Sequence, residues 1–128
     1  MKRILIASFL FIAVCTVVSV QRLSAQVTHI AATDFTTQVN LLDSYIAAGN
    51  TTAAQTEWTT VHNMMIAVLS YTKNSIKDAA TEADKASYRT IMTNQRDLYQ
   101  TIWTLKSDLT ANRAALHSKL GEFDLTIY

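Results

Sequence analysis

The sequence predicts an all-α protein, an antiparallel helical bundle of three helices preceded by a signal-peptide helix. Proline is absent from the 128 residues and glycine occurs only at Gly49 and Gly121, so the residues that most often interrupt helices are nearly missing. Three segments carry apolar side chains at the three- and four-residue spacings of an amphipathic helix. Because a chain of this length accommodates one modest core, we expect a single bundle domain over residues 26–128.

Residues 1–25 have the arrangement of a signal peptide. Lys2 and Arg3 supply a positive start, residues 4–20 form an uncharged apolar run, and Ala25 offers a small residue for cleavage. We therefore expect a periplasmic or secreted protein that begins at Gln26. The alternatives are a retained anchor, because an apolar run of this length approaches the roughly 20 residues that span a bilayer, and lipidation at Cys15.

The first helix of the bundle is predicted to contain about 15 residues, a common length in globular proteins. Its apolar stripe consists of Phe35, Val39, Leu42 and Ile46. Thr33 or Asp34 can cap the start, and Gly49 lies just past the end, where glycine is favoured.

The second helix is predicted over about residues 52–80. Its stripe consists of Trp58, Val61, Met65, Val68, Thr72 and Ile76. Thr52 and Gln55 have the spacing of a capping box at the start. Lys73 and Lys77 carry positive charge toward the end, where it complements the helix dipole.

The third helix has the longest and most regular stripe. Its members alternate steps of four and three as far as Leu116, and the last step is again four: Ile91, Gln95, Leu98, Ile102, Leu105, Leu109, Asn112, Leu116 and Leu120. This seam is typical of coiled-coil packing within bundles. Thr81 can cap the start and Gly121 can end the helix. Gln95 and Asn112, the polar members, are expected to fix the register or to face water.

The predicted lengths of the second and third helices do not match. At about 1.5 Å per residue, a helix over 82–120 is about 58 Å long, against about 43 Å for 52–80. Five apolar residues then have no partner in a three-helix hairpin: Leu116, Leu120, Phe123, Leu125 and Ile127. Either a fourth helix begins near residue 107, with Ser107 or Asp108 as its cap, or these residues meet another chain.

Of these two arrangements, the unbroken seam favours a continuous third helix. Apolar side chains left in water forgo the free energy of burial, so we expect self-association or a protein partner to cover the C-terminal segment. A third possibility is that Gly121 lets residues 122–128 fold back over the end of the bundle.

Charge and composition exclude several classes of function. Three of the eleven basic residues lie in the leader, so the remaining chain has eight basic and ten acidic residues and a net charge of −2. This balance provides no basic footprint for nucleic acid. Cys15, the only cysteine, also lies in the leader, which excludes disulfides, thiolate metal sites and c-type haem attachment in the mature chain. No catalytic motif or metal-binding motif occurs, so we expect a non-enzymatic protein without a cofactor and without membrane contact after cleavage of the leader.

One segment resembles a haem protein. Residues 112–119 read Asn-Arg-Ala-Ala-Leu-His-Ser-Lys and resemble the terminal helix of the cytochrome b562 family, exported bundles of about this size. The resemblance implies that His117 is a haem ligand. That family's second ligand is a methionine early in helix one, where this sequence has none. His62, beside the second stripe, is the other candidate ligand, and a haem- or metal-binding four-helix bundle is the alternative function.

A second resemblance points to a different class. Residues 109–113 read Leu-Thr-Ala-Asn-Arg and resemble the Leu-Thr-x-x-Gln pattern of periplasmic stress chaperones of the Spy type, with Asn in place of Gln. The resemblance implies a helical protein that binds clients. Tyr99 and Trp103, one turn apart beside the seam, either widen the core or form an exposed aromatic strip for a partner. We therefore predict a binding, assembly or chaperone-like module that acts through its surface.

Overall fold

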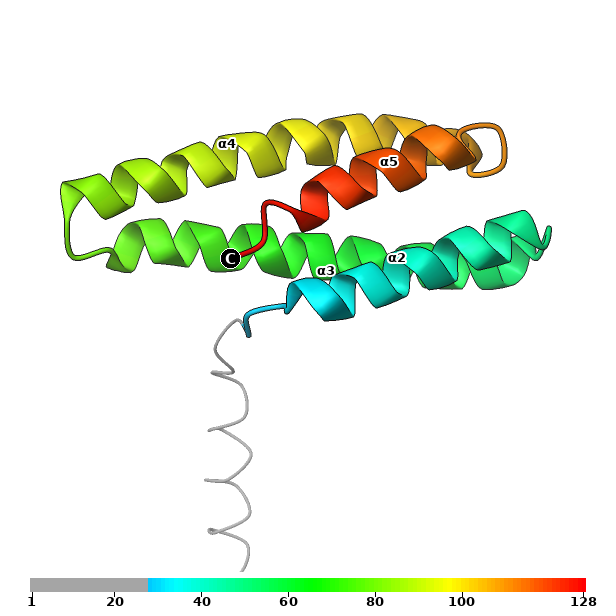
Figure 1. Ribbon diagram of the computed structural model, residues 1–128, viewed down its shortest axis with the longest axis horizontal. Helices are drawn as coiled ribbons and strands as arrows, with labels where there is room; N and C mark the ends of the chain where they lie inside the picture. Colours follow the sequence, from blue (N-terminus) through cyan, green and yellow to red (C-terminus); the bar gives the residue numbers. More distant parts are fainter. Residues whose placement is uncertain (1–27) are drawn as a thin grey trace, which may run out of the picture.

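The computed structural model describes residues 28–128 of the chain, and the predicted signal peptide lies outside the described residues. This part is all-helical, and it contains four α-helices: α2 (Ala32–Ala47), α3 (Thr51–Asp78), α4 (Glu82–Leu105) and α5 (Arg113–Asp124). The long helices α3 and α4 form an antiparallel hairpin, and the shorter α2 and α5 lie together along one side of it (Figure 1). Within residues 28–128 no helix combines the length and apolar character needed to cross a membrane.

The core lies between the α3–α4 hairpin and the α2–α5 pair. All four helices contribute buried apolar side chains: Phe35, Val39, Leu42, Ile46, Ala54, Trp58, Val61, Met65, Val68, Ile102, Leu116, Leu120 and Phe123, with Leu109 from the α4–α5 connection. Most of these residues belong to the predicted stripes, which also include Ile76, Ile91, Leu98 and Leu105, and these four are only half-buried. The rings of Phe35 and Phe123, with centroids 5.4 Å apart, join the first described helix to the last.

The expectation of a continuous third helix is wrong, and the four-helix alternative with a break near residue 107 is the observed fold. Helix α4 ends at Leu105 and is followed by a short 3-10 turn, Lys106–Asp108. The backbone N–H of Ala111 donates to Asp108 Oδ1 (2.9 Å), and Asn112 Nδ2 donates to the carbonyl oxygen of Leu105 (2.8 Å). These two bonds satisfy backbone groups that a continuous helix would pair internally.

The break also corrects the premise that the C-terminal segment lacks intrachain cover. Because α5 turns back along the hairpin, Leu116, Leu120 and Phe123 are buried in the chain's own core. Ile127 is half-buried against the same core, and only Leu125 is well exposed, at 86%. Gly121 neither ends the helix nor forms a hinge, since α5 continues to Asp124.

The helix ends agree in part with the predicted caps. Thr81 caps α4 by accepting the backbone N–H of Asp84 (3.0 Å), and Gly49 follows α2 with a positive φ of 69°, a conformation that favours glycine. Helix α3 is capped by Asn50, whose side chain accepts from Ala53 N, rather than by the predicted Thr52. Helix α2 begins after Ala31 without a side-chain cap.

The C-terminal tail extends the core beyond the end of α5. Gln95, fully buried in the α4 seam, donates from Nε2 to the carbonyl oxygen of Thr126 (3.2 Å). The ring of Tyr128 has its centroid 5.3 to 6.2 Å from those of His29, Tyr71 and Tyr88. Both polar seam residues therefore hold the chain that follows α4. Gln95 holds the C-terminal tail, and Asn112 holds the corner, which is the connection between α4 and α5.

Candidate binding surface on the α3–α4 hairpin

The structure brings three of the residues singled out in the sequence together on the hairpin. His62 Nε2 lies 3.0 Å from the hydroxyl oxygen of Tyr99. The ring centroid of Trp103 is 5.2 Å from that of His62 and 6.1 Å from that of Tyr99, and the Tyr99 and Trp103 rings are stacked. Tyr99 also packs against the core, whereas Trp103 is 45% exposed. The aromatic strip therefore joins the core at one edge and meets solvent at the other.

An apolar cleft continues along the same two helices. It has a volume of about 490 Å³ and is lined by Ile66, Leu69, Ser70, Lys73, Ile76, Met92 and Arg96. Ile66 is 41% exposed, while Leu69, Ile76 and Met92 are half-buried. The lining contains no residue of α2 or α5, so the cleft belongs to the hairpin alone.

The position of the cleft follows from helix geometry. Ile66, Leu69 and Arg96 of the cleft come one position after the buried residues Met65, Val68 and Gln95, and Trp103 of the aromatic strip follows Ile102 in the same way. One residue corresponds to about 100° around a helix of 3.6 residues per turn. In an antiparallel pair this rotation brings both second stripes to the same side, beside the core stripes.

The aromatic strip and the cleft form one surface. His62 lies one turn before Ile66 and Tyr99 one turn after Arg96, a spacing that places side chains next to each other on a helix. We call this surface the outer groove. It consists of His62, Ile66, Leu69, Ser70, Lys73, Ile76, Met92, Arg96, Tyr99 and Trp103.

The charged groups of the outer groove are all basic. Lys73 and Arg96 line the cleft, and no acidic residue does. At the aromatic end, Lys106 Nζ lies 4.1 Å from the centroid of the Trp103 ring, in the geometry of a cation–π contact. The apolar floor is therefore bordered by positive charge, although the mature chain as a whole is predicted to be slightly acidic.

The two candidate haem ligands lie in different surroundings. The Nε2 atom of His62 is engaged with Tyr99, and its ring lies between those of Trp58 and Trp103. His117 is on α5, with Nδ1 4.0 Å from Asp43 Oδ1 of α2. The structure does not bring the two histidines together, and residues 28–128 contain no group of three His, Cys, Asp or Glu residues arranged to hold a metal ion.

Asp43 forms the best-defined ion pair of the α2–α5 face. Arg113 donates from Nε and Nη2 to the two carboxylate oxygens of Asp43, at 2.8 and 2.7 Å. This bidentate bond with Arg113 lowers the pKa of the Asp43 carboxyl. The pair joins α5 to α2, so we assign it a structural role.

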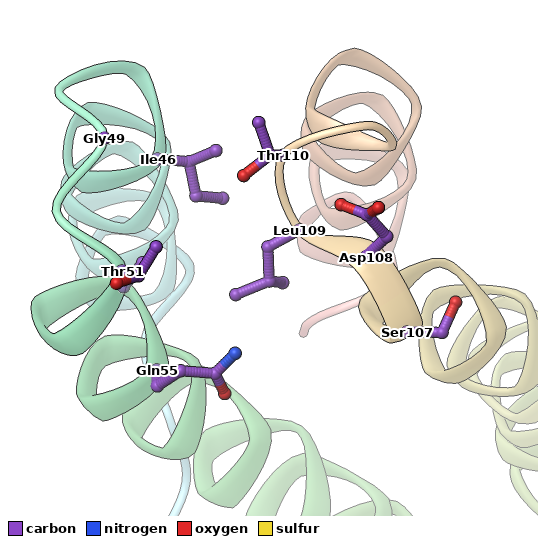
Figure 2. Close-up of a pocket in the computed structure, with 9 residues that line it drawn as sticks. Ile46, Gly49, Thr51, Gln55, Ser107, Asp108, Leu109 and Thr110 are labelled. Carbon is purple, nitrogen blue, oxygen red and sulfur yellow. The ribbon is translucent and has the colours of Figure 1, made fainter.

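A second pocket lies at the end of the bundle (Figure 2). It has a volume of about 220 Å³ and is lined by Ile46, Gly49, Thr51, Ala54, Gln55, Ser107, Asp108, Leu109 and Thr110. These residues come from the α2–α3 turn and from the α4–α5 corner, and Ile46 and Leu109 point into the space between them (Figure 2). Because the Asp108 carboxylate already accepts the N–H of Ala111, we interpret the pocket as the gap where the two connections meet.

Comparisons of the chain with protein-family models, with curated proteins and with solved structures gave no match. The functional argument therefore depends on the geometry of the outer groove. Sequence reasoning identified His62, Tyr99 and Trp103 but missed Ile66, Leu69, Met92 and Arg96. The signal that reveals them is a second apolar stripe displaced by one residue from the first on both hairpin helices.

Proposed function

We propose that this protein is an exported, non-enzymatic binding module that uses the outer groove to hold part of another protein. The observation that supports the proposal is a cleft of half-buried and exposed apolar side chains on the hairpin, which neither α2 nor α5 lines. Tryptophan, tyrosine, methionine and arginine are the residues most enriched in protein interfaces. Trp103, Tyr99, Met92 and Arg96 supply all four types.

The groove's chemistry also favours binding over catalysis. His62 and Tyr99 of the groove are hydrogen-bonded to each other. A general acid or base requires a positioned partner and a space for substrate beside it. The cleft itself is lined by aliphatic side chains, the Met92 thioether, the Ser70 hydroxyl and two basic side chains, which suits recognition of an apolar surface with acidic borders.

Site-specific photo-crosslinking in the exporting host tests the proposal. A benzophenone amino acid is placed at Ile66 in the groove, and the matched control carries it at the exposed Ala115 of α5. We expect covalent adducts from position 66 and none from position 115. A single discrete adduct indicates a dedicated partner, a ladder of adducts indicates chaperone-like binding of many clients, and equal adducts from both positions would contradict a groove-specific function.

The predicted export and cleavage of the leader can be tested separately. The leader's arrangement predicts that protein isolated from the host begins at Gln26. Mass spectrometry of the intact protein measures this directly. A molecule that still carries residues 1–25 in a membrane fraction would identify the retained anchor instead.

A further inference from the structure

We propose that the occupant of the outer groove is an amphipathic α-helix whose apolar stripe is bordered by Glu or Asp residues. The inference rests on the proposed function and specifies its partner. Three features of the groove support it: its linear shape, its half-buried and exposed apolar side chains, and the two basic residues that line it.

The shape fits a helix. Two antiparallel helices form a straight channel, and from Ile66 to Ile76 it extends ten residues, or about 15 Å. A third helix laid in such a channel contacts it through positions i, i+3, i+4 and i+7, the usual mode of helix-in-groove recognition. About three turns of the partner fill the cleft, and its next turn reaches the Tyr99 and Trp103 rings.

The side chains of the groove differ in how far they are exposed. Leu69, Ile76 and Met92 form a half-buried floor, whereas Ile66 and Trp103 stand out at 41% and 45% exposure. A ridge of side chains on a helix reaches the floor and the edges together.

The basic residues of the groove determine which charges are favourable beside the partner's apolar stripe. Lys73 and Arg96 line the cleft without any acidic neighbour in it, so acidic flanks on the partner are complementary and basic flanks are repelled. A second copy of the chain, docked groove to groove, brings Lys73 and Arg96 close to their own equivalents. The leader contains no Asp or Glu and is equally mismatched.

Two synthetic helical peptides test the inference. Both carry the same apolar stripe and no tryptophan, and they differ only in having Glu or Lys at the flanking positions. Each is titrated calorimetrically into the protein purified from the exporting host. We expect the Glu peptide to bind about tenfold more tightly at low ionic strength, with the difference shrinking as salt screens the charges.

Charge reversal provides the decisive control. In the double variant Lys73→Glu/Arg96→Glu we expect the preference to invert, so that the Lys peptide binds more tightly. Lys119→Glu, which reverses a charge on α5 away from the groove, is expected to leave the preference unchanged. Circular dichroism of each variant confirms that the helices are intact.

Several results would contradict the inference, and they can be told apart. Equal binding of both peptides, a preference unchanged by the double reversal, or binding only to vesicles of anionic phospholipid would overturn the acidic-helix assignment. A dimer in sedimentation that the Glu peptide does not dissociate would assign the groove to a second copy. If adducts at Ile66 persist while neither peptide binds, the inference fails and the proposed function stands; if both are absent, both fail.

Discussion

The inner and outer faces of the α3–α4 hairpin carry similar apolar chemistry in different surroundings. On the inner face, Met65 and Ile102 are fully buried under α2 and α5. One residue later on the same helices, Ile66 and Trp103 retain 41% and 45% of their exposure. The difference is that, within residues 28–128, α2 and α5 cover only the inner stripe. We infer that the inner stripe stabilises the bundle and that the outer stripe serves a partner.

The largest loss of stability is expected for a truncation on the inner face of the hairpin, where the core lies. Phe123→Ala removes a fully buried ring that contacts Phe35 and is expected to lower the free energy of unfolding by about 3–5 kcal/mol, the usual range for a core phenylalanine. Trp103→Ala is the matched aromatic truncation on the outer side, with an expected loss of less than about 1 kcal/mol because the side chain is half exposed. Urea denaturation compares the two, and similar losses would contradict the division of roles.

The next largest loss of stability is expected for a substitution in the corner between α4 and α5. Asn112→Ala removes the hydrogen bond to the carbonyl oxygen of Leu105, and the resulting loss is expected to be about 1–2 kcal/mol, as for a lost helix-end bond. Asn74→Ala, at an exposed position of α3, is the control. Equal unfolding midpoints for the two variants would mean that Asn112 does not hold the corner.

Glu57 lies on the core side of α3 and is expected to oppose folding at neutral pH. It is only 9% exposed, its Oε1 atom has no hydrogen-bond partner within residues 28–128, and burial raises its pKa. Glu57→Gln is therefore expected to stabilise the protein by about 1 kcal/mol at neutral pH, since it removes a buried charge. The gain is fully present above the raised pKa and disappears as the pH falls below the ordinary carboxyl value. Thermal melts across this range measure it, and a pH-independent effect would contradict the assignment.

The smallest change in stability is expected for a substitution of Asp43. Arg113 lowers the pKa of the Asp43 carboxyl, so the stabilisation is present above the ordinary carboxyl pKa and is lost as the pH falls through the lowered value. Asp43→Asn is expected to reduce the melting temperature slightly at neutral pH, because solvent screens the exposed Arg113 side chain. The difference from the unchanged protein should shrink as the pH falls through the lowered pKa of Asp43; a difference that grows would contradict the predicted sign.

The sequence was sufficient to predict the helices but not the break in the last one. The seam from Ile91 to Leu120 keeps its spacing through the corner, because α5 turns back over the same core and needs the same apolar positions. An apolar pattern is therefore identical for one long helix and for two that fold against a common core. The deciding signals were polar and local: Asp108 and Asn112 bond the backbone of the corner.

The candidate surface was predictable only in its aromatic part. Tyr99 and Trp103 are conspicuous because large aromatic residues beside a seam need an explanation. Ile66, Leu69 and Met92 did not stand out, since one apolar residue more or less widens a helix stripe without changing its period. Only the pairing of α3 with α4 shows that the two displaced stripes meet in one cleft.

The most direct test of the account separates binding from stability in a single variant. Ile66→Ser/Trp103→Ala removes the two most exposed apolar side chains of the outer groove, and a benzophenone amino acid at the neighbouring Ser70 reports occupancy of the cleft. We measure the yield of crosslinked partner in the exporting host, relative to the same reporter in the otherwise unchanged protein. We expect loss of the adduct from a protein whose urea midpoint is nearly unchanged. An undiminished adduct from the folded double variant would contradict it.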